Sequence, residues 1–186
     1  MRLIVAMTGA TGAILGIRLL EALSEMPGVE THLVVSRWAR STITLETGLT
    51  VSEVLKLAEV TYRPGDQTAA VSSGSFPTDG MVVIPCSMKT AAAIATGYGE
   101  DLIARAADVV LKERRRLVLV PRETPLSEIH LTNLLTLARA GASIVPPLPA
   151  FYNHPRSLDD IVGHIVARVL DQFGLEVPAR RWGARP

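Results

Sequence analysis

Short apolar runs alternate with amphipathic stretches along most of this chain. Five of the runs are four or five residues long, and each ends in a polar, glycine-containing or proline-rich segment: residues 3–7, 31–35, 80–84, 117–120 and 142–145. Runs of this kind are typical of parallel strands that helices cover on both faces. The pattern therefore predicts five strands of one sheet.

Between the runs, apolar residues recur every three or four positions, as they do on one face of a helix. The predicted helices span residues 14–26, 39–58 with a break near Gly48, 101–116, 127–140 and 158–173, and a further helix opens near residue 88. Only residues 62–78 interrupt the alternation, because their two prolines and two glycines favour an irregular excursion. Since right-handed crossovers join strands that alternate with helices, we expect a three-layer α/β fold with a mainly parallel sheet.

The composition is that of one domain and excludes several classes of partner. With 186 residues, 48% of them hydrophobic and 20% charged, the chain suits a single domain, expected over residues 1–178, followed by an arm at 179–186. The 19 Lys and Arg residues against 18 Asp and Glu give no general attraction to nucleic acid or to an anionic membrane. No apolar run approaches the ~20 residues of a membrane helix. Cys86 has no disulfide partner, and the first strand follows Met1 directly, so we expect a cytoplasmic protein.

The first apolar run leads into a loop of small residues, 8–16. Its spacing, Gly9-x-x-Gly12-x-x-x-Gly16, matches neither the dinucleotide fingerprint nor a P-loop. Such a loop lets the backbone approach a bound group, and free N–H groups at the start of the next helix suit a phosphate; a tight turn packed around glycine is the alternative. A nicotinamide dinucleotide fold would place Asp or Glu after the second run. Ser36 stands there instead, either as a ligand contact or as a helix N-cap.

The other strand ends also carry polar chemistry. Residues 87–90 hold two hydroxyls and Lys89, which suit an anion or a polar ring, although Lys89 is equally typical of a solvated first turn. Arg122 and Glu123 stand between two prolines and offer a planar fork and a proton-transfer group; a local salt bridge is the alternative. Tyr152 follows a proline-rich segment, over a pocket or in a packed crossover. Ligands of parallel sheets bind beyond the carboxyl ends of the strands, so these ends together indicate one crevice.

Six motifs resemble those of the flavin prenyltransferase family, the UbiX-like proteins that include the small subunit of phenolic acid decarboxylases. They are TGATG at residues 8–12, SGSF at 73–76, PCSMKT at 85–90, RAADVVLKERR at 105–115, VPRETPLSEIHL at 120–131 and PPLPAFYNHP at 146–155. The resemblance spans nearly the whole chain and implies a Rossmann-like or flavodoxin-like flavoprotein. It also implies a homo-oligomer, often a dodecamer, that joins the dimethylallyl group of dimethylallyl monophosphate to N5 and C6 of reduced FMN. The prenylated FMN then goes to a UbiD-like decarboxylase of aromatic acids.

The matching motifs also imply which residues bind FMN. Thr11 replaces the Ser of many members but keeps the hydroxyl. The implied contacts are Gly9, Ala10, Thr11, Ser36, Ser87, Met88, Lys89, Thr90 and Arg122.

A second set of residues resembles the contacts to the prenyl phosphate. Tyr152 and Arg168 match these contacts, and Lys112 and Arg105 match supporting cations from the same or a neighbouring subunit. Arg168 borders the apolar stripe of its predicted helix, where a snorkelling side chain is the alternative.

The chemistry of prenyl transfer fits these residue types. An allylic phosphate that ionises leaves charge on the departing phosphate, and an Arg, Lys and Tyr cluster stabilises that charge without a metal; the four His residues show no metal-ligand spacing either. The implied catalytic residues are Glu123, Ser87 and Lys112, with Glu123 or the released phosphate as the base for ring closure. The rival functions are a flavin redox protein or cysteine decarboxylase on the same fold, and a non-catalytic FMN-carrying subunit.

Overall fold

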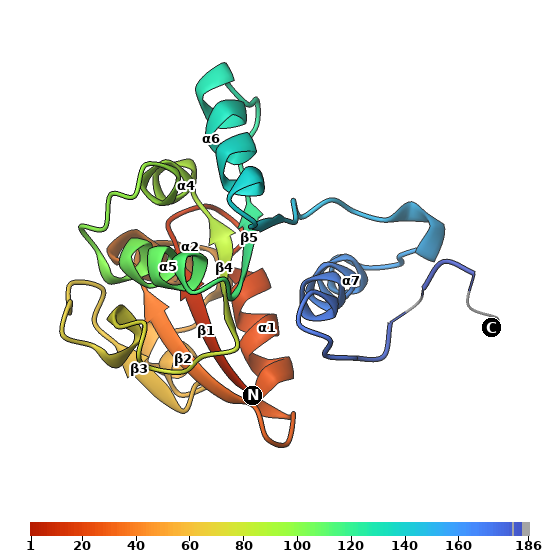
Figure 1. The fold of residues 1–186 in the computed structure, drawn as a ribbon. Helices are drawn as coiled ribbons and strands as arrows, with labels where there is room; N and C mark the ends of the chain where they lie inside the picture. The colour runs from red at the N-terminus through yellow and green to blue at the C-terminus, as the bar shows by residue number, and fades with distance from the viewer. Residues whose placement is uncertain (180, 184–186) are drawn as a thin grey trace.

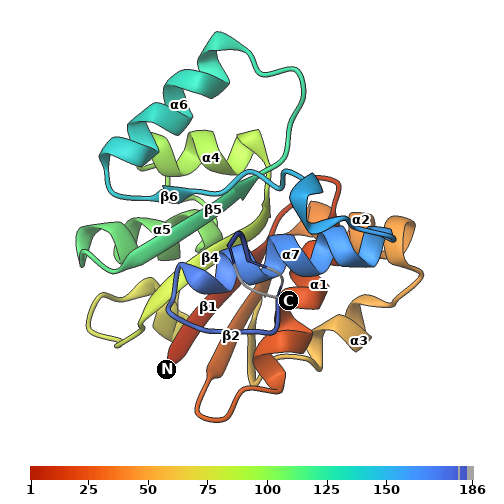
Figure 2. The ribbon, with the colours of Figure 1, turned by 90° about the vertical axis from the view of Figure 1, so that its right-hand side faces the viewer.

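The computed structural model describes residues 1–179 and 181–183, and Figures 1 and 2 show a parallel sheet between two layers of helices. The strands are β1 (Arg2–Met7), β2 (Glu30–Val35), β3 (Val60–Tyr62), β4 (Gly80–Cys86), β5 (Arg116–Pro121) and β6 (Ser143–Ile144). The helices are α1 (Ala13–Ser24), α2 (Arg37–Thr47), α3 (Val51–Leu55), α4 (Met88–Ala95), α5 (Leu102–Lys112), α6 (Glu128–Arg139) and α7 (Leu158–Asp171), with short 3-10 helices η1 (Ala70–Ser72) and η2 (Phe151–Asn153).

The strand order is β3-β2-β1-β4-β5-β6, and every neighbouring pair is parallel. The chain thus winds outward in one direction from β1 and in the other from β4, which confirms the Rossmann-like three-layer α/β prediction. The winding reverses between β1 and β4, and ligands of open parallel sheets bind beyond the strands' carboxyl ends at such a point.

The prediction of five strands is wrong by one, because the apolar pattern does not mark β3. This strand has only three residues, Val60–Tyr62, and it pairs with β2 alone at the edge of the sheet. An edge strand with little burial has no long apolar run. The predicted break at Gly48 is confirmed, since this residue ends α2 with φ 68°. The helix predicted to reach residue 116 instead ends at Lys112.

Alternate residues of the central strands face two separate cores. Leu3 and Val5 point to the layer of α1, α2, α3 and α7, whereas Ile4 and Ala6 point to the layer of α4, α5 and α6. A strand covered on both faces must be apolar at every position, which is why these strands form uninterrupted apolar runs. No helix among the described residues is long and apolar enough to cross a membrane.

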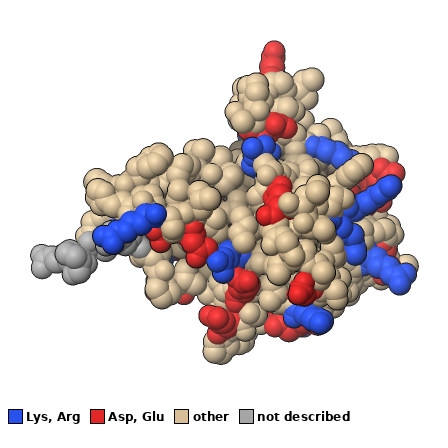
Figure 3. All heavy atoms as spheres, turned by 180° about the vertical axis from the view of Figure 1, so that it is seen from behind, with Lys and Arg blue, Asp and Glu red and all other residues tan. Residues whose placement is uncertain are grey.

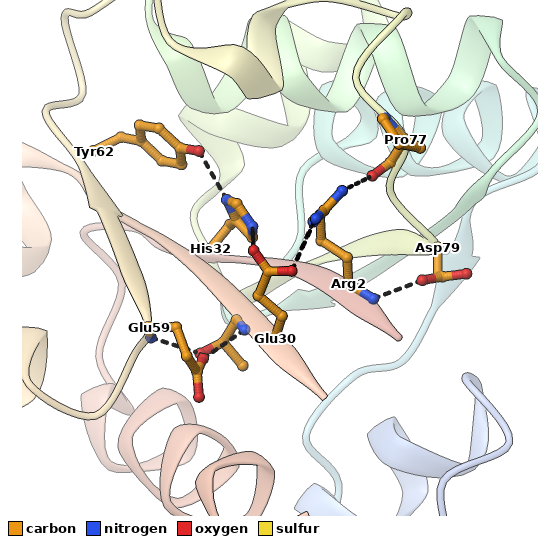
Figure 4. Close-up of polar contacts among 8 residues, drawn as sticks. Arg2, Glu30, His32, Glu59, Tyr62, Pro77 and Asp79 are labelled. Atoms are coloured by element: carbon orange, nitrogen blue, oxygen red, sulfur yellow. Dashed lines mark hydrogen bonds and ion pairs between the residues drawn. The ribbon is translucent and has the colours of Figure 1, made fainter. Parts of the chain in front are cut away.

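A polar network braces the amino ends of the strands and the irregular excursion that leads into β4 (Figure 4). The Arg2 side chain forms an ion pair with Glu30 at 2.9 Å and donates to the carbonyl oxygen of Pro77 at 2.9 Å. The buried His32 ring contacts Glu30 Oε1 at 2.9 Å and the hydroxyl of Tyr62 at 2.8 Å. The Arg2 guanidinium, followed by His32, holds the pKa of Glu30 below its ordinary value. The excursion is thus irregular, as expected, but firmly tied to the sheet.

The division into one domain at 1–178 and an arm at 179–186 stays a prediction. Residues 180 and 184–186 of that arm lie outside the described residues.

Candidate functional site

Thr8 joins the carboxyl ends of β1 and β4. Its backbone N–H and its hydroxyl donate to the carbonyl oxygen of Pro85 at 3.2 and 2.8 Å, and the same hydroxyl accepts from the Ser87 N–H at 2.8 Å. The Thr8 residue is only 1% exposed, so these bonds are shielded from water. This junction fixes the glycine loop relative to Ser87 at the point where the strand order reverses.

The glycine loop packs closely against the first turn of α2. A Cβ on Gly9 would lie 2.3 Å from Trp38 Cβ, so only glycine fits there. Gly12 adopts a left-handed conformation with φ 99° immediately before α1. The backbone N–H groups of Gly12 and Ala13 donate to Glu46 Oε2 at 2.9 and 3.0 Å. The expectation of free N–H groups at this helix start is therefore wrong for Gly12 and Ala13, because a carboxylate of α2 accepts from both.

Glu46 is the residue of this region that sequence reasoning missed. It lies in the last turns of α2, and no motif or spacing connects it to the loop before α1. Only the packing of α2 beside α1 brings its carboxylate to the positive end of that helix, where an anion is stabilised.

The hydroxyls at the ends of β2 and β4 cap the following helices. The Ser36 side chain accepts from the backbone N–H three residues later at 3.1 Å, which confirms the N-cap alternative. Ser87 caps α4 through the Thr90 N–H at 3.3 Å, and the two hydroxyls lie 3.1 Å apart. Met88 is buried among core residues, so its side chain faces the interior, whereas Lys89 is exposed.

Arg122 and Glu123 extend the same edge of the sheet. The Arg122 N–H donates to the carbonyl oxygen of Cys86 at 3.1 Å, which holds the end of β5 beside the end of β4. Both side chains are exposed, and Glu123 Oε1 accepts from the Thr124 N–H at 3.0 Å. Within the described residues the two side chains form no ion pair with each other, so the salt-bridge alternative is not realised.

Tyr152 and Arg168 border a hollow between η2, α7 and the C-terminal segment. The Tyr152 ring meets the edge of Trp182 at a centroid distance of 5.3 Å. Arg168 pairs with Asp171, whose carboxylate also accepts two bonds from Arg181 at 2.7 and 2.8 Å. Arg181, the strongest contributor, and Arg168 lower the pKa of Asp171. The hollow encloses about 410 Å³ and is lined by Tyr152, His164, Ala167, Arg168, Ala179, Arg181 and Trp182.

Arg105 and Lys112 lie on α5, in the layer on the opposite face of the sheet from α7. Arg105 donates to the carbonyl oxygen of Ser72 at 3.1 Å and to Asp108 at 2.8 Å. Lys112 forms an ion pair with Glu113 at the end of the helix. Both cationic side chains are more than a third exposed, at 38% and 47%.

The candidate residues thus form three groups rather than one site. The first lies at the carboxyl ends of β1, β2, β4 and β5, the second on η2 and α7, and the third on α5. Figure 1 shows η2 standing out from the body beyond α7, well away from the strand ends and from α5. The expectation that Tyr152 and Arg168 face the strand ends across one crevice is therefore not met within a single chain.

Large apolar side chains are exposed on α6 and around η2. On α6, which projects from the body in Figure 1, Ile129 is 71% exposed, and near η2 Phe151 is 74% exposed. Seen from behind in Figure 3, this projection is mostly uncharged, while acidic and basic residues mix over the rest of that face. Apolar surface of this kind is typical of subunit contacts. Further large apolar residues are exposed on and just before α6, before η2 and at the start of α7: Leu126, Leu131, Leu135, Leu148 and Leu158.

Comparisons with known proteins give one consistent result. The family model described as Flavoprotein matches residues 1–170. A probable UbiX-like flavin prenyltransferase of Streptomyces sp. (strain D7) is 72% identical over 183 residues, which cover 98% of this chain and 92% of the relative.

Two solved structures have the same fold over nearly all of the chain. The dodecameric FMN-dependent UbiX-like decarboxylase of Escherichia coli O157:H7 has a TM-score of 0.98 at 66% identity, covering 99% of this chain and 100% of that one. AnUbiX (PadA1), solved in complex with FMN and dimethylallyl pyrophosphate, has a TM-score of 0.97 at 56% identity, covering 100% of this chain and 98% of that one.

Proposed function

This chain belongs to the flavoprotein family and is a UbiX-like flavin prenyltransferase, and on that premise we propose how its three groups of residues divide the reaction. The observation that carries the assignment is the 72% identity over 98% of the chain. The reaction joins a dimethylallyl group to reduced FMN, and AnUbiX (PadA1) was solved with FMN and a dimethylallyl compound bound together.

We assign FMN to the strand-end group. The loop at Gly9 packs closely on the first turn of α2. The hydroxyls of Ser36 and Ser87, which cap helices, and the hydroxyl of Thr90 each keep further hydrogen-bonding capacity. Arg122 adds a planar cation beside them. The remaining proposed contacts are Ala10, Thr11, Lys89 and the backbone of Met88, since its side chain is buried in the core.

We assign the prenyl phosphate to Tyr152, Arg168, Lys112 and Arg105. These four residues lie on opposite faces of one chain, so a complete phosphate site requires neighbouring copies. The exposed apolar residues of α6 and η2 supply surface for such an assembly, and the Escherichia coli relative is dodecameric. We therefore propose that each site combines groups from different subunits of a homo-oligomer, with a dodecamer as its expected size.

The residues of the chain then account for the departure of the phosphate and for the two bonds that form to the flavin. Reduced FMN supplies the two positions, N5 and C6, that become alkylated. The C–O bond of the allylic phosphate breaks with its electron pair going to the phosphate, and the Arg, Lys and Tyr groups stabilise the charge that develops there. As N5 bonds to the allylic carbon, it gives up its proton to Glu123 or to the released phosphate. The same group can return that proton to the prenyl double bond as C6 bonds to it, and it then accepts the proton that C6 loses. Ser87 positions the ring edge through its hydroxyl.

The donor is dimethylallyl monophosphate, no metal is needed because the cations of the chain neutralise the phosphate, and a UbiD-like decarboxylase receives the prenylated FMN in the cytoplasm. We expect the activity to be unchanged after chelator treatment. We also expect the product to activate a separately purified apo-decarboxylase.

Mass spectrometry of the flavin tests the proposal. The protein is incubated anaerobically with reduced FMN and dimethylallyl monophosphate, and we expect the flavin to gain one five-carbon prenyl unit. An intact, FMN-loaded protein that adds no mass would instead favour a redox or FMN-carrying role. Mixing a Lys112→Met chain with a Tyr152→Phe, Arg168→Met chain tests the shared site. At a low concentration of dimethylallyl monophosphate the mixed oligomers should be more active than either parent, because some sites then receive every group intact.

A further inference from the structure

Gly74, in the SGSF segment, leaves space that the Lys112–Glu113 ion pair fills. A Cβ built on Gly74 would lie 2.7 Å from Lys112 Nζ and 2.2 Å from Glu113 Oε1. The backbone does not require glycine at this position, because Gly74 is not among the residues with positive φ. Glycine at this position therefore leaves room for the Lys112 side chain, and it is not needed to form a turn.

Two arginines hold the segment around Gly74 firmly against α5. Arg115 donates to the carbonyl oxygens of Gly74 at 2.7 Å and Phe76 at 2.9 Å. Arg105 donates to the carbonyl oxygen of Ser72 at 3.1 Å.

Phe76, at the other end of the SGSF segment, contacts Arg2 and His32 of the polar network in Figure 4. The Phe76 ring packs under the Arg2 guanidinium at 4.7 Å and against the His32 ring at 5.4 Å. The segment is thus a fixed wall, and the ammonium of Lys112, on its flexible stem, rests beside it.

We propose that Gly74 positions the Lys112 ammonium for the prenyl phosphate. The inference rests on the proposed contact between Lys112 and that phosphate. The three heavy atoms nearest to a methyl group at residue 74 belong to the far ends of two flexible side chains, Lys112 and Glu113, which move at little cost to the fold. What changes is where the Lys112 charge lies, and the attraction between an ammonium and a phosphate falls as their distance grows.

Gly74→Ala is the variant that isolates this effect, and Gly65→Ala is its matched control. Gly65 lies in the same excursion, also without positive φ, and nothing lies within 4 Å of a Cβ built there. In the anaerobic prenylation assay we expect Gly74→Ala to raise the KM for dimethylallyl monophosphate by about tenfold, with kcat changed less than KM. The melting temperature and the affinity for FMN should match those of Gly65→Ala.

A double-variant comparison separates positioning from a structural effect. Lys112→Met should itself raise the KM, and adding Gly74→Ala to it should cause no further rise, because the group that Gly74 positions is gone. Additive effects of the two substitutions, or a normal KM in Gly74→Ala while Lys112→Met is impaired, would overturn the inference alone. A normal KM in Lys112→Met would instead remove the proposed phosphate contact, and the inference with it.

Discussion

Replacing Thr8 with Val tests whether the junction of β1 and β4 holds the candidate FMN residues in place. Valine has nearly the shape of threonine, so no cavity forms, but the hydroxyl that bridges Pro85 and Ser87 is lost. The carbonyl oxygen of Pro85 keeps the Thr8 N–H as a donor at 3.2 Å, whereas the Ser87 N–H loses its acceptor at 2.8 Å. The variant therefore leaves one backbone donor unpaired next to the core.

The size of the effect follows from that single lost acceptor. An unsatisfied buried donor costs roughly 1–3 kcal/mol, and we take about 2 kcal/mol because Ser87 is half-buried. For a chain of this length, about 2 kcal/mol lowers the melting temperature by roughly 4–8 °C. Since Ser87 is free to shift once Thr8 no longer holds it, we also expect FMN affinity to fall by about tenfold, or about 1.4 kcal/mol.

Urea unfolding at one fixed protein concentration measures the stability change, because assembly makes stability depend on concentration. Thr8→Ser is the control: it keeps both hydrogen bonds of the side chain and loses one buried methyl group, at a cost of about 1 kcal/mol. Its FMN affinity should stay at the wild-type value. A Thr8→Val protein that is as stable as the wild type and binds FMN equally well would refute the reasoning.

Three further predictions concern the helices around the site. A Cβ at Gly16 would lie 2.7 Å from the carbonyl oxygen of Ile84, so Gly16→Ala should destabilise the protein by about 1–3 kcal/mol in thermal unfolding. In the same assay Gly163→Ala should stabilise the protein by about 0.5–1 kcal/mol, because alanine favours the helix α7 and its methyl group meets nothing within 4 Å. Glu46→Ala removes the acceptor of the first N–H groups of α1 and should cost about 1 kcal/mol in the same measurement, with equal stability arguing against this role. Arg181 and Arg168 hold the pKa of Asp171 below its ordinary value, so the stabilisation it gives is complete above the unfolded pKa and is lost as pH falls through the folded pKa. Asp171→Asn should be less stable at pH 7 and converge with the wild type in strong acid, as urea titrations at several pH values would show.

Local chemistry makes part of the site predictable. Ser36 and Ser87 can be identified because a hydroxyl directly before an amphipathic stretch is an N-cap signal, and both cap their helices. Arg122 and Glu123 can be identified from their place at a strand end. Glu46 cannot, because its partners lie 33 and 34 residues away along the chain and meet it only through packing of α1 and α2.

The sequence by itself determined the alternation of strands and helices, since strands covered on both faces must be apolar and amphipathic helices must repeat every three or four residues. It also placed polar residues at the strand ends. The tertiary structure decided which ends meet: Thr8 with Ser87, and Glu46 with the start of α1. It also placed α5 and α7 on opposite faces of the sheet, so that the candidate phosphate residues of one chain lie apart. Spacing along a chain carries no information about which face a crossover covers, and this is why the separation of these residues within one chain emerged only from the packed fold.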